Sequence, residues 1–164
     1  MQIIQKEENG RLDVMLEIVK APFSLRLFLG IFMVIGFLTP VAVLILNLYK
    51  DLEFGFSFIT TVIIGLLVGF YLLRLILWNT YGKENLAIYS DKIKYHCDYK
   101  YFKGNKKTLH GSQLSAEPKW EHQRNSGKLK IASEHGAIET SIYLPQDKLM
   151  KLVEDINSQF RNAE

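Results

Sequence analysis

Two long uncharged segments dominate the pattern of apolar and polar residues in this sequence. Residues 27–49 are 23 consecutive positions without a charge, and residues 54–73 are another 20. As helices these segments measure at least about 30 Å, which is the thickness of the hydrocarbon core of a bilayer. Neither segment carries the polar face that a helix on the surface of a soluble protein needs. The pattern therefore predicts two transmembrane helices, over residues 26–49 and 54–78.

The short connection between the two segments fixes their arrangement. Residues 50–53 are too few to cross a bilayer, so the helices must be antiparallel neighbours whose outer ends emerge on one side. Because basic residues accumulate in cytoplasmic segments, their distribution gives the orientation. The connection carries only Lys50, whereas the other side has Arg11, Lys20, Arg26, Arg74, Lys83, Lys92 and Lys94. We therefore expect both termini in the cytoplasm, and no cleaved signal peptide.

Residues suited to the membrane interface stand at the ends of the predicted helices. Arg26 and Arg74 fall near the cytoplasmic end, where long basic side chains can reach the headgroups. Tyr49 at one boundary, and Trp78 and Tyr81 at the other, are aromatic residues of the kind found at headgroup depth. These five residues are predicted to be interfacial anchors.

Small residues recur in the second apolar segment. Thr61, Gly65 and Gly69 are spaced four apart on one helix face, which lets two helix backbones approach closely. This helix-packing stripe could face the first helix of the same chain or a second copy, so a homo-oligomer stays open. No Asp, Glu, His, Lys or Arg occurs within residues 27–49 or within residues 54–73, whereas transport pathways usually contain ionisable groups at mid-membrane. The hairpin is therefore predicted to be an anchor.

The sequence after the second segment changes to an alternating pattern. In residues 93–101 every odd position is apolar or aromatic and every even position is polar, as in a strand with one buried face. After Pro145 the apolar residues adopt helical spacing, which predicts an amphipathic helix over residues 146–161. Turn residues separate further strands, predicted over residues 85–90, 106–110, 117–122, 128–132 and 137–143.

The residues before the first apolar segment are predicted to form a hairpin. Residues 2–8 and 11–19 flank Asn9-Gly10, a dipeptide typical of a two-residue hairpin turn. An amphipathic helix over residues 11–20 is the alternative. Because a lone hairpin is marginally stable in water, we expect residues 1–20 to join the sheet formed further along the chain.

The organisation of the chain resembles that of a known family. Residues 82–95, GKENLAIYSDKIKY, look like the opening strands of bacterial pleckstrin-homology-like (PH-like) domains, and Tyr143-Leu144-Pro145 before a helix is also similar. Such domains often follow a two-helix membrane hairpin in small bacterial proteins. The resemblance implies an α+β protein of the bacterial inner membrane, with a transmembrane helical hairpin (residues 21–81) inserted into a PH-like antiparallel β domain (residues 82–164) with one C-terminal helix. It also implies a binding or assembly module rather than a catalyst.

Few residues suggest chemistry. No phosphate-binding, zinc or nucleophile motif occurs, and His96, His110, His122 and His135 are not spaced as metal ligands. Cys97 falls in the apolar phase of its strand, which favours a buried thiol over a nucleophile. The net charge of +3 is too small to indicate nucleic acid. We expect no catalytic residue, metal, cofactor or nucleic-acid partner.

One basic cluster flanks the predicted Gly104-Asn105 turn, beside Tyr101 and Phe102. Its members are Lys100, Lys103, Lys106 and Lys107. Close to an anionic membrane surface each lysine would contribute about 1 kcal/mol, and a solvated hairpin tip is the alternative. Trp120, beside Lys119 and Glu121, is interpreted as a core residue, and an exposed anchor for a partner is the alternative.

These observations favour a membrane-anchored, non-enzymatic binding or scaffold protein. Its cytoplasmic domain would engage a protein partner or the anionic membrane surface. Two alternatives stay open. One is an immunity-type protein that neutralises a membrane-acting toxin, and the other is a homo-oligomeric channel or transporter subunit built through the small residues.

Overall fold

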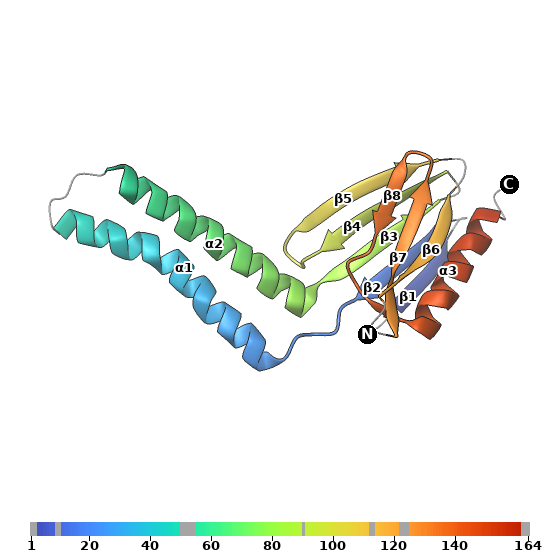
Figure 1. The fold of residues 1–164 in the computed structure, drawn as a ribbon, viewed down its shortest axis with the longest axis horizontal. Coiled ribbons are helices and arrows are strands. Elements are labelled where there is room, and N and C mark those ends of the chain that lie inside the picture. Colours follow the sequence, from blue (N-terminus) through green and yellow to red (C-terminus); the bar gives the residue numbers. More distant parts are fainter. Residues whose placement is uncertain are drawn as a thin grey trace. The chain divides into compact units, whose positions relative to one another are not determined.

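The fold was analysed in a computed structural model, which describes residues 3–8, 11–49, 55–89, 91–111, 114–121 and 125–161 (Figure 1). The chain forms two compact units. One unit is Val19–Tyr81, and the other combines Met1–Ile18 with Gly82–Glu164. The predicted Asn9-Gly10 turn, the connection over residues 50–53 and His122 lie outside the described residues.

The first unit consists of two long helices, α1 (Phe23–Tyr49) and α2 (Phe56–Tyr81). Helix α2 begins after Gly55, whose carbonyl accepts hydrogen bonds from the amides of Phe58 and Ile59. It continues three residues beyond the predicted end at residue 78, so Tyr81 is helical. Side chains bond to carbonyls one turn back in this final stretch, Asn79 to Leu75 at 2.8 Å and Thr80 to Ile76 at 2.7 Å.

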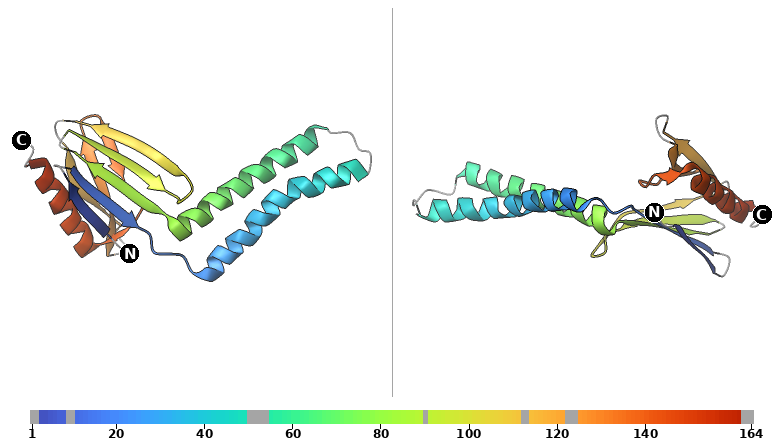
Figure 2. Two further views of the ribbon diagram at one scale, coloured as in Figure 1. Left: turned by 180° about the vertical axis from the view of Figure 1, so that it is seen from behind. Right: turned by 90° about the horizontal axis from the view of Figure 1, so that it is seen from below.

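The two helices run side by side (Figure 2), and small residues allow their close approach. A Cβ atom added at Gly65 would lie 2.7 Å from Cγ of Pro40 and 3.0 Å from the carbonyl oxygen of Gly36. One added at Gly69 would lie 3.1 Å from the ring of Phe37. Gly65 and Gly69 thus face α1 of the same chain, and the absence of a side chain at both positions allows this contact.

The second unit contains a five-stranded antiparallel sheet in the order β1-β2-β3-β4-β5. The pairing of β2 with β3 places Val14 opposite Leu86, so the residues before and after the helices share one sheet. This pairing requires that residues 11–17 form a strand, and the alternative helix over residues 11–20 is wrong. The five strands are β1 (Ile3–Glu8), β2 (Arg11–Glu17), β3 (Lys83–Ile88), β4 (Lys92–Asp98) and β5 (Lys103–His110).

A second sheet in the same unit centres on β7, which pairs with β6, β8 and β9. The single strand predicted over residues 137–143 is divided, because the chain leaves β8 after Glu139. At this bend Thr140 is buried and its amide donates to the carbonyl of Leu129 at 2.9 Å. The elements are β6 (Ser115–Trp120), β7 (Ser126–Ser133), β8 (Gly136–Glu139), β9 (Leu144–Pro145) and the helix α3 (Gln146–Arg161).

The core of this unit lies between the two sheets and under α3 (Figure 2). Each inner strand contributes every second residue, as in Leu12, Val14 and Leu16 of β2, because side chains alternate between the faces of a strand. Helix α3 contributes Leu149, Leu152, Val153 and Ile156 from one face. These findings confirm the predicted α+β class with two apolar helices, antiparallel strands and a C-terminal helix.

Candidate binding surface and buried carboxyl

The turn between β4 and β5 differs from the predicted one. Strand β4 ends at Asp98, and the amide of Tyr99 donates to the carbonyl of Phe102 at 3.0 Å. Lys100 has a φ of 77°, and its amide is held at 2.7 Å by Oδ1 of Asp98. Residues 99–102 therefore form the hairpin tip, and the prediction of a strand as far as residue 101 is wrong.

Gly104 and Asn105, predicted to be the turn, lie inside β5. The register shifts here from Tyr95–Lys107 to Cys97–Gly104, so β5 carries one extra residue and the β-bulge lies in β5 at Asn105 and Lys106. Asn105 has a φ of 49°, a left-handed conformation that asparagine adopts more readily than most residues. The Gly104-Asn105 pair therefore indicated an irregular backbone correctly, but the irregularity is a bulge and not a turn.

The hairpin tip exposes aromatic side chains beside lysines. Tyr101 is 71% exposed, which contradicts its predicted place on the core face of a strand. Nζ of Lys100 lies 5.3 Å from the centre of the Tyr101 ring. Phe102 is also exposed and stacks on the buried Tyr99, with 4.6 Å between ring centres. The tip thus combines apolar surface with positive charge.

Two of the four predicted lysines act together on His96. His96 lies on β4, and its pKa is lowered first by partial burial and then by the charges of Lys103 and Lys106, while Asp98 opposes this effect. The local potential on this side of the hairpin is therefore positive. Lys107 is also exposed on β5, opposite Tyr95 in the register, and Lys100 stands at the turn.

The register places this tip at one particular end of the sheet. Glu17 pairs with Lys83, Lys83 with Asp98, and Asp98 with Lys103, so these four residues form one row across β2 to β5. Nζ of Lys83 forms an ion pair with Glu17 in this row. Strand β2 ends and β3 begins at the same row. Both chain connections to the helices therefore leave the end of the sheet that carries the β4–β5 tip.

The solvent face of the same sheet is also basic. A shallow basin of about 650 Å³ lies over β1 to β5, lined by groups that include Lys6, Lys94, His96 and Lys103. At its margin, Tyr89 has the cationic groups of Arg11, Lys92 and Lys94 at 5.6, 5.3 and 5.8 Å from its ring centre. Arg11 is in turn held by both carboxylate oxygens of Asp13.

A different group of reactive side chains is buried between the sheets. Oε1 of Glu84 accepts hydrogen bonds from the hydroxyl of Tyr95 at 2.9 Å and from the amide of Ser141 at 2.7 Å. Sγ of Cys97 lies 3.2 Å from the same hydroxyl. Because that hydroxyl donates to Glu84, the thiol is the donor in this second contact. The carboxyl of Glu84 thus links the first sheet to the segment between β8 and β9.

Burial decides what the Glu84 cluster can do. Glu84 is 0% exposed, and its Oε2 has no hydrogen-bond partner among the residues that the structure describes. Burial raises the pKa of Glu84, while the amides of Ser141 and Ile142 and the hydroxyl of Tyr95 act in the opposite direction. Cys97 is buried as predicted. Since the three side chains are enclosed, they stabilise the fold and are not accessible to a substrate.

The predicted interfacial residues lie at helix ends. Tyr49 is the last residue of α1 and is exposed, and Tyr81 is the last residue of α2. Arg26 lies in the first turn of α1, while Arg74 and Trp78 lie in the last two turns of α2. Thr61 lies one turn before Gly65 on α2 and is half-buried.

Trp120 is not a core residue. It ends β6 and is 40% exposed, because Gly127 on the paired strand leaves it at the margin of the second sheet. Within the residues that the structure describes, no group of three or more His, Cys, Asp or Glu side chains could hold a metal ion.

Fold and site together define an α+β protein with an apolar helical hairpin and a β unit bearing a basic, aromatic hairpin tip. Comparison of the sequence with models of protein families and with curated proteins finds no match.

Proposed function

We propose that this chain is a membrane-anchored, non-enzymatic binding protein of the bacterial inner membrane, whose β unit engages the anionic lipid surface through the β4–β5 tip. The observation that carries the proposal is the exposure of Tyr101 and Phe102, with Nζ of Lys100 over the Tyr101 ring and the exposed Lys103 next to Phe102 in the chain. Aromatic rings favour the headgroup layer, and lysines are attracted to anionic lipids. The two sheets followed by a C-terminal helix also suit the PH-like architecture.

The helices support the membrane part of the proposal. Each contains an 18-residue window of high hydropathy of which only 6% is buried. Large apolar side chains such as Phe28, Ile35 and Leu67 are therefore uncovered. An apolar surface of this extent is untenable in water, and a bilayer would cover it. The stripe of Gly65 and Gly69 already contacts α1, which argues against a channel assembled through these residues.

The sheet topology supports the lipid contact. Only Gly82 separates α2 from β3, and residues 18–22 separate β2 from α1. Both connections join the row of Glu17 and Lys83, which also carries the base of the β4–β5 tip. The chain connections to the apolar helices and the β4–β5 tip therefore share one end of the sheet.

Insertion is tested by alkaline extraction of membranes and by reporters fused to each end of the full chain. We expect the protein to stay in the pellet and both reporters to be cytoplasmic, because the basic residues lie beside the termini. Extraction by alkali, or export of either reporter, would contradict the membrane part of the proposal.

The lipid contact is tested with the full chain in nanodiscs. A fluorophore on a Tyr101→Cys variant should be quenched by brominated lipid when the disc contains phosphatidylglycerol, and less so in pure phosphatidylcholine. Quenching should weaken with added salt, since the Debye length is only about 10 Å at 0.1 M. The charge reversal Lys103→Glu/Lys106→Glu should reduce it, while the matched reversal Lys148→Glu/Lys151→Glu on α3 should not. Equal quenching in both kinds of disc would contradict the lipid contact.

A further inference from the structure

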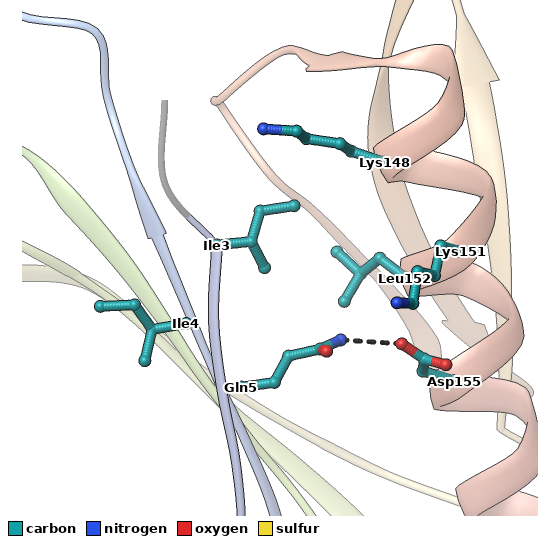
Figure 3. A pocket seen from close by; sticks show the side chains of 7 residues that line it. All are labelled: Ile3, Ile4, Gln5, Lys148, Lys151, Leu152 and Asp155. Carbon is teal, nitrogen blue, oxygen red and sulfur yellow. Dashed lines mark hydrogen bonds between the residues drawn. The ribbon is translucent and has the colours of Figure 1, made fainter.

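A groove separates strand β1 from helix α3 within the β unit (Figure 3). It has a volume of about 420 Å³ and is lined by Ile3, Gln5 and Leu152. Nε2 of Gln5 donates to Oδ2 of Asp155 at 3.1 Å, which bridges the groove at one point. Figure 3 shows Ile3 and Gln5 directed toward α3, whereas Ile4 points away. The groove therefore offers the half-buried Ile3 as its apolar contact, beside one polar bridge and the charged groups of α3.

The groove exists because the core does not extend to β1. Ile3 pairs with Leu16 and Gln5 with Val14, so all four side chains lie on the inner face of the sheet. Leu16 and Val14 are fully buried, whereas Gln5 is exposed and Ile3 is half-buried. Among the described residues, β1 pairs only with β2. Strand β1 thus has both an uncovered inner face and an open edge.

The other edges of the two sheets carry features that discourage further pairing. Strand β5 has Lys103, Lys106 and Lys107, and β6 contains Pro118, which lacks an amide donor. Strand β8 has only 4 residues. Lysines, prolines and short strands are the devices that protect sheet edges. Strand β1 carries Lys6 further along, but its start, Ile3–Gln5, has no lysine or proline, and this is where the groove lies.

The charge around the groove indicates what would enter it. Lys148 and Lys151 stand on the first turns of α3 at its rim, and neither has an ion-pair partner among the described residues. Asp155, the one acidic group of the lining, is already bonded to Gln5. The rim therefore favours a negatively charged occupant.

We propose that this groove binds an extended acidic peptide segment of a partner protein, which adds as a strand to β1. Main-chain hydrogen bonds to β1 supply affinity, as in other cases of strand addition. An apolar side chain of the peptide packs on Ile3, and an acidic one faces Lys148 and Lys151. This site is separate from the β4–β5 tip, so the protein binds lipid and peptide independently.

The probe is a random eight-residue peptide library displayed on phage and selected on the full chain in phosphatidylcholine nanodiscs, with empty discs as the background. We expect enrichment of sequences that alternate apolar and acidic residues. The best peptide is then synthesised, and its affinity is measured by fluorescence anisotropy. The Lys148→Glu/Lys151→Glu variant should bind it about tenfold more weakly, and Lys103→Glu/Lys106→Glu should bind it unchanged.

Backbone methylation distinguishes strand addition from contacts through side chains alone. Two peptides are compared, one N-methylated at the odd residues and the other at the even residues. In one of these two phases the methyl groups remove the amide donors that face β1, and in the other phase they remove the donors that face solvent. One phase should abolish binding, and the other should leave it within about twofold. Equal effects of the two phases, no enrichment over empty discs, or binding of a second copy of the chain instead of peptide would overturn the proposal.

Discussion

Tyr95 donates a hydrogen bond of 2.9 Å to Glu84, and both side chains are buried on neighbouring strands. The same carboxylate oxygen accepts the amide of Ser141 at 2.7 Å. An unsatisfied buried polar atom costs about 1–3 kcal/mol, so Oε2 of Glu84, which has no partner within the described part of the chain, is a weak point of the fold. The contact between the sheets is therefore sensitive to the protonation of one residue.

Replacing that carboxyl should change how stability depends on pH. Burial raises the pKa of Glu84 above its usual value of 4.5, so the folded state holds this proton to higher pH than the unfolded state. The stabilisation from Glu84 is complete below pH 4.5 and is lost as the pH rises through the folded-state pKa, at a rate of at most about 1.4 kcal/mol per pH unit. The stability of Glu84→Gln relative to wild type should therefore increase with pH.

The measurement is thermal unfolding of the full chain in detergent, followed by the β-sheet signal in circular dichroism between pH 4 and 8. The matched control is Glu154→Gln on the exposed face of α3, whose difference from wild type should stay constant. A difference between Glu84→Gln and wild type that does not vary with pH would contradict this account.

The packing of the helices makes a second prediction. In Gly65→Ala the new Cβ would lie 2.7 Å from Cγ of Pro40, so the helices must separate, at a cost of about 1–3 kcal/mol. At Gly30 nothing lies within 4 Å of the added atom, so Gly30→Ala should be tolerated. Unfolding of the helical hairpin in dodecyl sulfate titrations should show the difference. Equal behaviour of the two variants would mean that the helices do not pack through Gly65.

Helix α3 should depend on Gly127 of β7. An added Cβ there would lie 2.8 Å from the carbonyl oxygen of Lys119 and 2.9 Å from Cδ2 of Leu149. Because one of these atoms is backbone, Gly127→Ala should destabilise the β unit by about 1–3 kcal/mol. Hydrogen exchange measured by mass spectrometry should show faster exchange in α3. The neighbouring Ser126→Ala, at a half-buried position, serves as control, and an equal increase in both variants would argue against a specific clash.

His96 offers a reporter of the charge on the β4–β5 hairpin. Lys103 and Lys106 lower its pKa, so Lys103→Gln and Lys106→Gln should each raise it toward its ordinary value. Anionic lipid that neutralises these lysines should do the same. Nuclear magnetic resonance titration of the labelled imidazole measures both effects. A pKa of His96 that is indifferent to the two substitutions would show that burial alone sets it.

The sequence alone determined the elements that depend on local pattern. The uncharged segments predicted both apolar helices, because the length of an apolar segment can be read from consecutive residues. The helical spacing after Pro145 predicted α3 over residues 146–161. The alternation around Cys97 correctly placed its thiol in the core. The alternating pattern did not predict where the strand ends. Tyr101 has the same spacing as Tyr95 and Cys97, but it is exposed because the strand ends at Asp98.

Only the tertiary structure decided which distant residues meet. The partners of Glu84 lie 11 and 57 positions away, and its polar side chain gave no signal of burial. The open edge of β1 depends on where α3 packs, and the place of the β4–β5 tip depends on the register from Glu17 to Lys103. Such contacts are set by the pairing of whole strands and by the closure of the core, which no single segment of sequence specifies.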